Sequence, residues 1–204
     1  MDAAGFAAHV GPVLIHRTRA ENRAAIAALG LMPAAQLAHR AGVAPEALVL
    51  RPERMRLQIG AHRALLTHQR PLLAGRGDFL DAHTPKSWAL QLDRRLFFWP
   101  TRRGAAFGAS LDGAVVTLPL DARRFFAAFA PDIDLSPINS GNATRRPARR
   151  GDWLYVPVSA GWDAFAENRR ARGLVASRDR IGEVSIRRAI PPDLLRHLLT
   201  EDML

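Results

Sequence analysis

The sequence predicts an α+β fold, and three observations lead to this prediction. Apolar runs of strand length are scattered along the chain without the regular alternation of strand and helix that a doubly wound sheet needs. Segments with helical spacing stand between these runs and are bounded by threonine, proline or glycine. The chain has 204 residues, 48% of them hydrophobic, which is enough to bury one core. We therefore expect a single domain over residues 1–204.

The first predicted elements are a buried strand and a helix. The strand begins at Val13 and ends in His16-Arg17-Thr18. Alanine and isoleucine recur at helical spacing over residues 21–29, and Gly30 is expected to end that helix. Thr18 or Asn22 is placed to cap its start.

The rest of the chain continues this mixture. Thr84 is expected to cap a helix that begins at Pro85 and runs to Asp93. Residues 62–68 are ambiguous, and residues 135–150 are predicted to form a loop because they are rich in Pro, Asn, Gly and Arg. Further helices are predicted over residues 33–41 and 122–129, and strands over residues 55–59, 96–99, 115–118, 153–158 and 183–186.

Residues 35–48 allow a second interpretation, because their pattern also fits the first two helices of a helix-turn-helix DNA reader. Such a module needs an unbroken recognition helix after the turn. Here Arg51 precedes Pro52, and proline disfavours a helical conformation at the residue before it, which leaves under two helical turns. We therefore favour a helical hairpin that covers one face of the sheet.

The charge of the chain favours a polyanionic partner without identifying one. The formal net charge is +10 and the pI is about 11.5, and a basic surface binds phosphates with release of counterions. Lys86 is the only lysine, however, so the arginine excess is also what a GC-rich genome produces. Nucleic acid is therefore a possible partner on this ground, and a solvated basic surface is the alternative.

Several classes of site are disfavoured by composition. The chain has no cysteine, so disulfides and thiolate sites are excluded. No run approaches the roughly 20 apolar residues of a membrane span, and we expect a cytoplasmic protein that does not use a membrane. The seven histidines show no His-x-x-x-His spacing, so no metal site is predicted. A Ser-His-Asp triad stays open but lacks a Gly-x-Ser-x-Gly turn.

His16 and Glu183 are the residues whose side chains and positions are best suited to ligand binding or catalysis. His16 stands at the mouth of a strand, where one ring nitrogen can be fixed by a neighbour while the other is free to donate to a ribose hydroxyl. A core histidine satisfied by backbone carbonyls is the alternative. Glu183 opens a short strand, and a carboxylate there can stabilise positive charge that develops in a transition state. An exposed residue at a strand edge is the alternative for Glu183.

Three separated segments resemble the motifs of ADP-ribosyltransferases, and in particular of DarT-like enzymes that modify nucleic acid. Related uncharacterised bacterial proteins share further blocks of this sequence. The first segment is His16-Arg17-Thr18 with Asn22 and Gly30-Leu31, and the others follow in the order that the family uses. They are Arg95-Leu96-Phe97-Phe98-Trp99 and Gly182-Glu183-Val184-Ser185-Ile186 with Ile190-Pro191-Pro192.

The resemblance implies a split sheet with a central cleft, NAD as substrate and a toxin-like function. His16, Thr18 and Asn22 would contact the cofactor, with His16 and Thr18 holding the ribose and amide on the nicotinamide side. An aromatic ring of the second segment, Phe97 or Phe98, would stack on nicotinamide, and we favour Phe98. Glu183 would be catalytic, acting on an oxocarbenium-like transition state. The first and last motifs would lie on adjacent central strands and line one cleft.

A polar segment supplies candidate residues for binding the acceptor. Short amides and hydroxyls there could read a base, and the arginines could hold phosphates, although a turn-rich polar loop explains the same composition. The candidates are Asn139, Ser140, Arg145, Arg146, Arg149 and Arg150.

The predicted function is therefore NAD-dependent ADP-ribosyl transfer, most plainly to nucleic acid, with a protein acceptor or NAD hydrolysis as variants. The alternative is a non-enzymatic nucleic-acid-binding or regulatory protein with an arginine-rich surface. The sequence does not identify the acceptor, the oligomeric state or an antitoxin partner.

Overall fold

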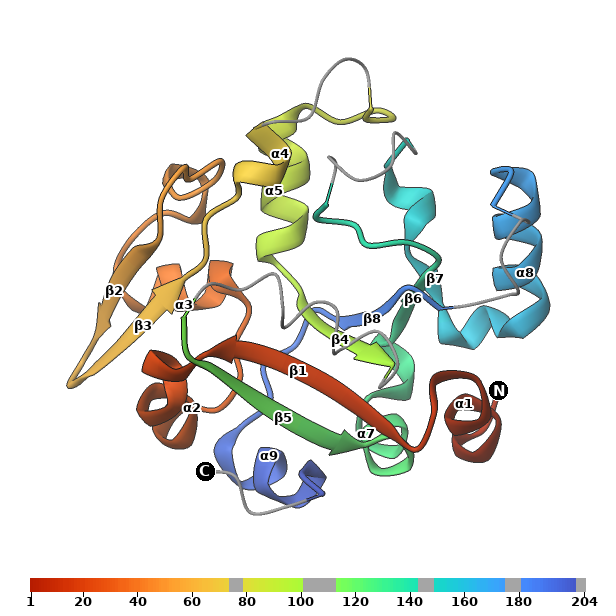
Figure 1. Cartoon of the computed structure of the whole chain (residues 1–204), viewed down its shortest axis with the longest axis horizontal. Helices are drawn as coiled ribbons and strands as arrows, with labels where there is room; N and C mark the ends of the chain where they lie inside the picture. Colours follow the sequence, from red (N-terminus) through yellow and green to blue (C-terminus); the bar gives the residue numbers. More distant parts are fainter. Residues whose placement is uncertain (74–78, 101–112, 143–148, 175–180, 201–204) are drawn as a thin grey trace.

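The structure is a computed structural model that describes residues 1–73, 79–100, 113–142, 149–174 and 181–200. Its centre is a sheet of six strands, and a separate hairpin forms a second, smaller sheet (Figure 1). The large sheet contains β1 (Val13–Arg19), β4 (Leu96–Pro100), β5 (Val115–Asp121), β6 (Asp134–Ser136), β7 (Val156–Pro157) and β8 (Glu183–Ile186). The hairpin consists of β2 (Met55–Ile59) and β3 (His62–Leu66). The prediction of an α+β fold is confirmed.

The large sheet is antiparallel and has the order β5-β1-β4-β8-β6-β7. The strand β4 lies between β1 and β8, so the expectation that the first and last motifs occupy adjacent strands is wrong. Along its whole length β1 pairs with β5, but among the described residues it pairs with β4 at Leu14 and Ile15 alone. Beyond Ile15 the two strands separate, and this separation shapes the site described below.

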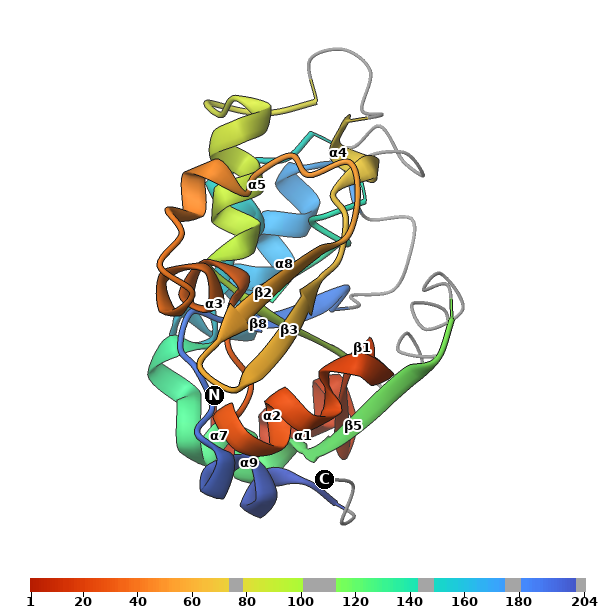
Figure 2. The same ribbon diagram turned by 90° about the vertical axis from the view of Figure 1, so that its left-hand side faces the viewer.

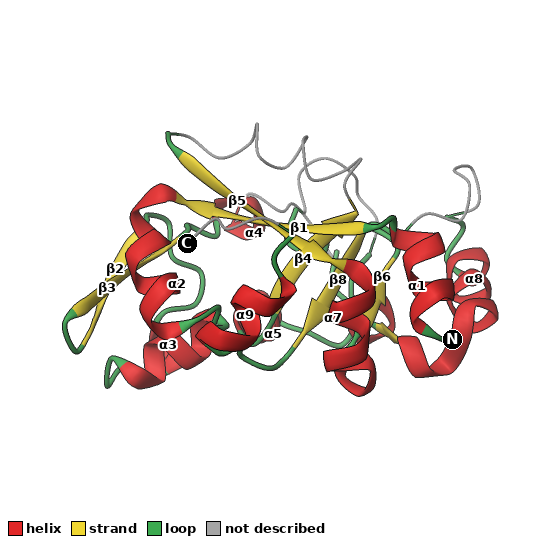
Figure 3. Ribbon diagram, turned by 90° about the horizontal axis from the view of Figure 1, so that it is seen from below, coloured by secondary structure: helices red, strands yellow, loops and turns green. Residues whose placement is uncertain are grey.

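Helices cover one face of this sheet (Figure 3). Three of them, α1 (Ala3–Val10), α7 (Ala122–Phe129) and α9 (Pro192–Leu198), share one apolar core with Leu14 of β1, Phe98 of β4 and Val184 of β8. The remaining helices among the described residues are α2 (Arg23–Leu29), α3 (Ala34–Arg40), α4 (Arg70–Leu73), α5 (Pro85–Asp93) and α8 (Gly161–Ala171). Short 3-10 turns are η1 (Ala20–Asn22), η2 (Pro45–Ala47), η3 (Ala130–Asp132), η4 (Asp152–Leu154) and η5 (Val158–Ala160).

Local signals explain where two helices begin and end. The Thr84 side chain accepts from the Ser87 backbone N–H in a complete capping box, with Pro85 in the first turn of α5, as predicted. The helix α2 ends at Gly30, where φ is +80°. A Cβ atom there would stand 2.1 Å from the Ile190 carbonyl oxygen, so only glycine lets these backbones meet.

Three expectations about local structure are wrong, two of them entirely and the third in part. Neither Thr18 nor Asn22 caps α2, which instead follows directly from the 3-10 turn η1 and has no side-chain cap. Residues 153–158 do not form one strand, because the backbone turns through η4 and η5 and leaves only the two residues of β7 extended. The predicted loop at 135–150 also overlaps β6 at its start.

The structure does not contain a helix-turn-helix at residues 35–48. After α3 the chain makes a turn and then the short 3-10 helix η2, with no recognition helix following. This region instead packs on the hairpin (Figure 2). Ala38 and Leu48 share a small apolar cluster with Leu57 and Leu66 of the hairpin. The helical region therefore covers the hairpin and not the large sheet.

Candidate ligand-binding cavity

A cavity of about 410 Å³ lies where β1 separates from β4, a volume typical of small-molecule sites. Both strands contribute to its lining, together with α2, β3, the segment 139–142 and the first residue of β8. The sequence-predicted residues that line it are His16, Thr18, Asn22, Phe97, Asn139, Ser140 and Glu183. Phe98, Arg149 and Arg150 do not line it, and Arg145 and Arg146 lie outside the described residues.

His16 is half-buried beside the split between the strands. Its Nδ1 lies 2.9 Å from the Phe97 carbonyl oxygen, and because a carbonyl only accepts, Nδ1 must carry the proton and donate. Burial lowers the pKa of His16, which favours the neutral ring. The expectation that its other nitrogen donates is therefore wrong, because Nε2 of this tautomer offers a lone pair that accepts from a hydroxyl.

Asn22 has a structural task at the wall of the cavity. Its Nδ2 donates to Thr18 Oγ1 over 2.9 Å and to the Leu65 carbonyl over 3.0 Å, while Oδ1 accepts from the Leu65 N–H at 2.7 Å. Both amide protons are used, so this side chain has no donor left for a ligand. Asn22 instead fixes β3 of the hairpin to the end of β1.

Glu183 is 1% exposed at the start of β8. Its Oε1 accepts from the Ser140 backbone N–H over 2.9 Å. Burial raises the pKa of Glu183 to about 7, although contacts with Ser140 and the positive charges of Arg150 and Arg95 oppose this rise. A carboxyl group that titrates near neutral pH can both release and take up a proton, as general acid-base catalysis requires.

The strand register places His16 and Glu183 on opposite faces of the sheet. Ile15 pairs with Trp99 and Phe97 pairs with Ser185, so side-chain alternation puts Glu183 on the face of Trp99 and His16 on the other face. A cleft on one side of the sheet would need both side chains to project from the same face, and they do not. Both residues nevertheless line the same cavity, because it extends through the gap between β1 and β4.

The preference for Phe98 as the aromatic residue of the cleft is wrong. Phe98 is fully buried in the core under α7, with its ring centroid 4.7 Å from that of Phe125. Phe97 and Trp99 share the opposite face, as alternation requires, and both line the cavity.

The polar segment 139–142 forms a tight turn that its own side chains stabilise. Asn139 Oδ1 accepts from the backbone N–H groups of Gly141 and Asn142. Arg150 is 2% exposed and donates to the carbonyl groups of Asn139, Ser140 and Asn142. The expectation that Arg150 holds phosphates is therefore wrong, because its guanidinium is enclosed by this turn.

Arg149 is half-exposed but also has a partner. Its guanidinium forms an ion pair with Asp81 and donates to the Leu80 carbonyl. The expectation of a phosphate contact at Arg149 is not supported, because a carboxylate already occupies one side of this group.

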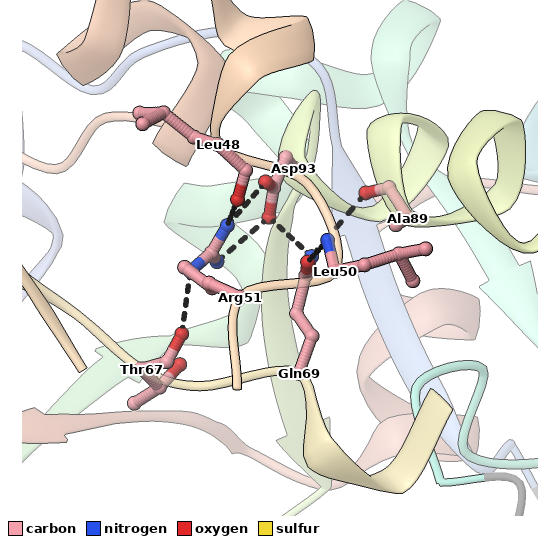
Figure 4. Close-up of polar contacts among 7 residues, drawn as sticks. All are labelled: Leu48, Leu50, Arg51, Thr67, Gln69, Ala89 and Asp93. Carbon is pink, nitrogen blue, oxygen red and sulfur yellow. Dashed lines mark hydrogen bonds and ion pairs between the residues drawn. The ribbon is translucent and has the colours of Figure 1, made fainter. Parts of the chain in front are cut away.

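The cavity is also lined by four arginines that no sequence pattern groups together, namely Arg17, Arg19, Arg51 and Arg95. Arg51 makes a bidentate ion pair with Asp93 at 2.6 and 3.0 Å (Figure 4). Gln69 donates to the same carboxylate over 3.0 Å. Arg95 pairs with Asp134 over 2.5 Å. Each pair joins residues at least 24 positions apart, so no local pattern could have revealed it.

The Arg51–Asp93 pair also anchors the hairpin to α5. Arg51 donates to the carbonyl groups of Leu48 and Thr67, and Gln69 accepts from the Leu50 N–H (Figure 4). The segments entering and leaving the hairpin are thus held at one carboxylate. This anchor makes β3 a fixed wall of the cavity.

A Ser-His-Asp arrangement is present away from the cavity. His83 contacts Ser87 Oγ through Nδ1 at 3.1 Å and Asp152 through Nε2 at 3.0 Å. The Ser87 hydroxyl belongs to the capping box of α5, where it accepts from the Thr84 N–H. This arrangement therefore stabilises a helix start. Within the described residues no cluster of metal-ligating side chains occurs, and no helix there is long and apolar enough to cross a membrane.

The fold and the cavity define an α+β protein with an arginine-lined cavity where β1 separates from β4. The chain belongs to a family of unknown function, DUF7002, whose model matches residues 12–198. This match includes every strand of both sheets. No curated protein and no solved structure matches the chain.

Proposed function

We propose that the protein is an NAD-dependent ADP-ribosyltransferase that modifies nucleic acid. The observation that carries the proposal is that His16 and Glu183, from opposite ends of the chain, line one cavity together with Phe97. These residues come from the three segments that resemble the transferase motifs. The net charge of +10 supports a polyanionic acceptor.

The proposed chemistry assigns a separate task to each of these side chains. His16 accepts from a ribose hydroxyl through Nε2, and the Phe97 ring provides a flat apolar surface for nicotinamide. The glycosidic bond breaks with its electron pair moving to the nicotinamide nitrogen. The ionised Glu183 carboxylate stabilises the positive charge that develops on the ribose. It then takes the proton that the acceptor loses when its new bond to the ribose forms.

Replacement of Glu183 tests this proposal. Glu183→Gln keeps the size of the side chain but removes its charge, so NAD affinity should change little while turnover falls by about 10²- to 10³-fold. NAD consumption is measured with single-stranded DNA, RNA, protein and water as acceptors. Glu167→Gln, on the exposed face of α8, is the matched control and should retain wild-type turnover.

Two results would contradict the enzymatic proposal. One is a wild-type protein that neither binds nor consumes NAD with any of these acceptors. The other is normal turnover by Glu183→Gln. Binding of nucleic acid without NAD consumption would favour the non-enzymatic alternative.

A further inference from the structure

We propose that Arg17 and Arg19 form a phosphate-binding subsite of the cavity, which takes the diphosphate group of a dinucleotide. The subsite itself follows from the burial and charge of these two side chains. Only its assignment to the diphosphate of NAD rests on the proposed function.

In the part of the chain that the structure describes, Arg17 and Arg19 lack the carboxylate partners that buried arginines normally have. Arg19 is 4% exposed and Arg17 is half-buried, and both line the cavity. Among the described residues, the buried Nε of each has no hydrogen-bond partner, and neither guanidinium pairs with a carboxylate. A buried cation without a counter-charge is unfavourable, so an anionic ligand would relieve a cost that the described residues do not offset.

The other charges of the cavity do not supply this counter-charge. Asp93 is engaged by Arg51, and Arg95 is paired with Asp134. Glu183 lies near Arg95 and Arg150, whose charges act on it. Two positive charges, those of Arg17 and Arg19, therefore remain uncompensated in the described lining.

The geometry of β1 suits a group with two phosphates. Residues two apart on a strand project to the same face about 7 Å from one another, so the two guanidinium groups can approach one diphosphate together. Arginine binds phosphate oxygens through pairs of N–H groups.

The depth of the site favours a small ligand over a polymer. Arg19 has almost no exposed surface, whereas a nucleic-acid backbone is normally bound by arginines on an accessible surface. A small diphosphate ester that diffuses freely can enter a cavity of about 410 Å³. We therefore assign the subsite to the nucleotide substrate, and nucleic-acid binding at these residues becomes an outcome of the test.

Calorimetric titration of the full chain with inorganic pyrophosphate tests the subsite. Arg17→Met and Arg19→Met should each weaken pyrophosphate binding at least about tenfold, because each removes charge-assisted hydrogen bonds. Arg23→Met removes the same charge from the exposed start of α2 and should bind as wild type does. Wild-type affinity in both cavity variants would overturn the proposal.

The thermal unfolding midpoint without ligand gives a second readout that does not depend on activity. Arg19→Met should raise the midpoint, because it removes an uncompensated buried charge. A structural arginine would give the opposite result, so a fall in the midpoint or failure to fold would count against the subsite. Arg19→Lys keeps the charge but loses the paired N–H geometry, and it should bind pyrophosphate more weakly than wild type does.

Parallel titrations with NAD and a short single-stranded DNA separate the two proposals. Loss of both pyrophosphate and NAD binding in the variants supports the subsite and its assignment. Arginine-dependent pyrophosphate binding without any NAD binding or consumption supports the subsite but contradicts the proposed function. NAD consumption with an unchanged KM in both variants contradicts the subsite alone. Arginine dependence confined to the DNA contradicts the diphosphate assignment.

Discussion

Glu183 shows how one residue acquires its properties from groups that are distant in sequence. Its position at the start of a strand made it a candidate, and the structure places it in the cavity. The backbone N–H that binds it belongs to Ser140, in a turn held by Arg150. Gly182 permits this arrangement, since a Cβ there would stand 2.7 Å from the Ile138 nitrogen. Sequence alone could identify the carboxylate but not the groups that determine its pKa.

The raised pKa of Glu183 predicts a pH-dependent effect on stability. The folded-state pKa of about 7 lies above the ordinary value of 4.5, so the folded protein holds this proton more tightly than the unfolded chain does. The resulting stabilisation is present below pH 4.5 and is lost as the pH rises through 7. It amounts to about 3 kcal/mol.

Glu183→Gln removes this dependence, so its free energy of unfolding relative to wild type should rise between pH 5 and pH 8. Urea unfolding at both pH values measures the difference. Glu167→Gln should show a constant difference from wild type. A constant difference for Glu183→Gln as well would contradict the assigned pKa.

At the scale of elements, the sequence was most informative where the signal is local. Thr84 and Pro85 lie within four residues of the groups they satisfy, and α5 begins where they predict. The strand predicted at residues 153–158 is wrong although its apolar side chains fit a strand. Hydrogen bonds such as that from the Leu154 N–H to the Gly151 carbonyl form turns there instead. The separation of β1 from β4 depends on which strands pair, and no local pattern encodes that.

The carboxylate of Asp93 anchors both segments that flank the hairpin, and this gives a prediction about stability. Asp93→Asn removes the charge opposite Arg51 and leaves that guanidinium buried without compensation. We expect a loss of about 3–5 kcal/mol in the free energy of unfolding. Asp193→Asn also breaks an ion pair, but its carboxylate is 94% exposed, so it should cost less than about 1 kcal/mol. Urea unfolding of the two variants makes the comparison, and similar small losses would show that the anchor contributes little.

At the scale of the whole molecule, composition and strand pattern predicted the α+β class but not the strand order. The order requires pairs such as Phe97 with Ser185, which are too far apart for periodicity to reveal. The same applies to charge. The total of +10 is plain from the sequence, but the burial of Arg19 and Arg150 becomes evident only in the folded chain.

The net charge predicts strongly salt-dependent binding of nucleic acid. If the surface contacts about six phosphates, affinity for single-stranded DNA should fall roughly 300-fold between 50 and 200 mM salt. The logarithm of affinity should fall linearly with the logarithm of salt concentration. Fluorescence anisotropy measures this slope, and an oligomer of the same bases with an uncharged backbone is the control. Absence of binding to DNA at 50 mM salt, or a flat salt response, would contradict a role for the charge.

The central place of β4 has a consequence for synthesis on the ribosome. Its two neighbours are β1, which is made early, and β8, which begins only at Glu183. Until β8 emerges, the nascent chain presents β4 with one open edge, a surface on which strands from other chains can add. We expect β4 to gain its second neighbouring strand only after β8 has left the exit tunnel. Because Glu183 is the first residue of β8, the proposed catalytic carboxylate takes its place only when this last strand pairs with β4.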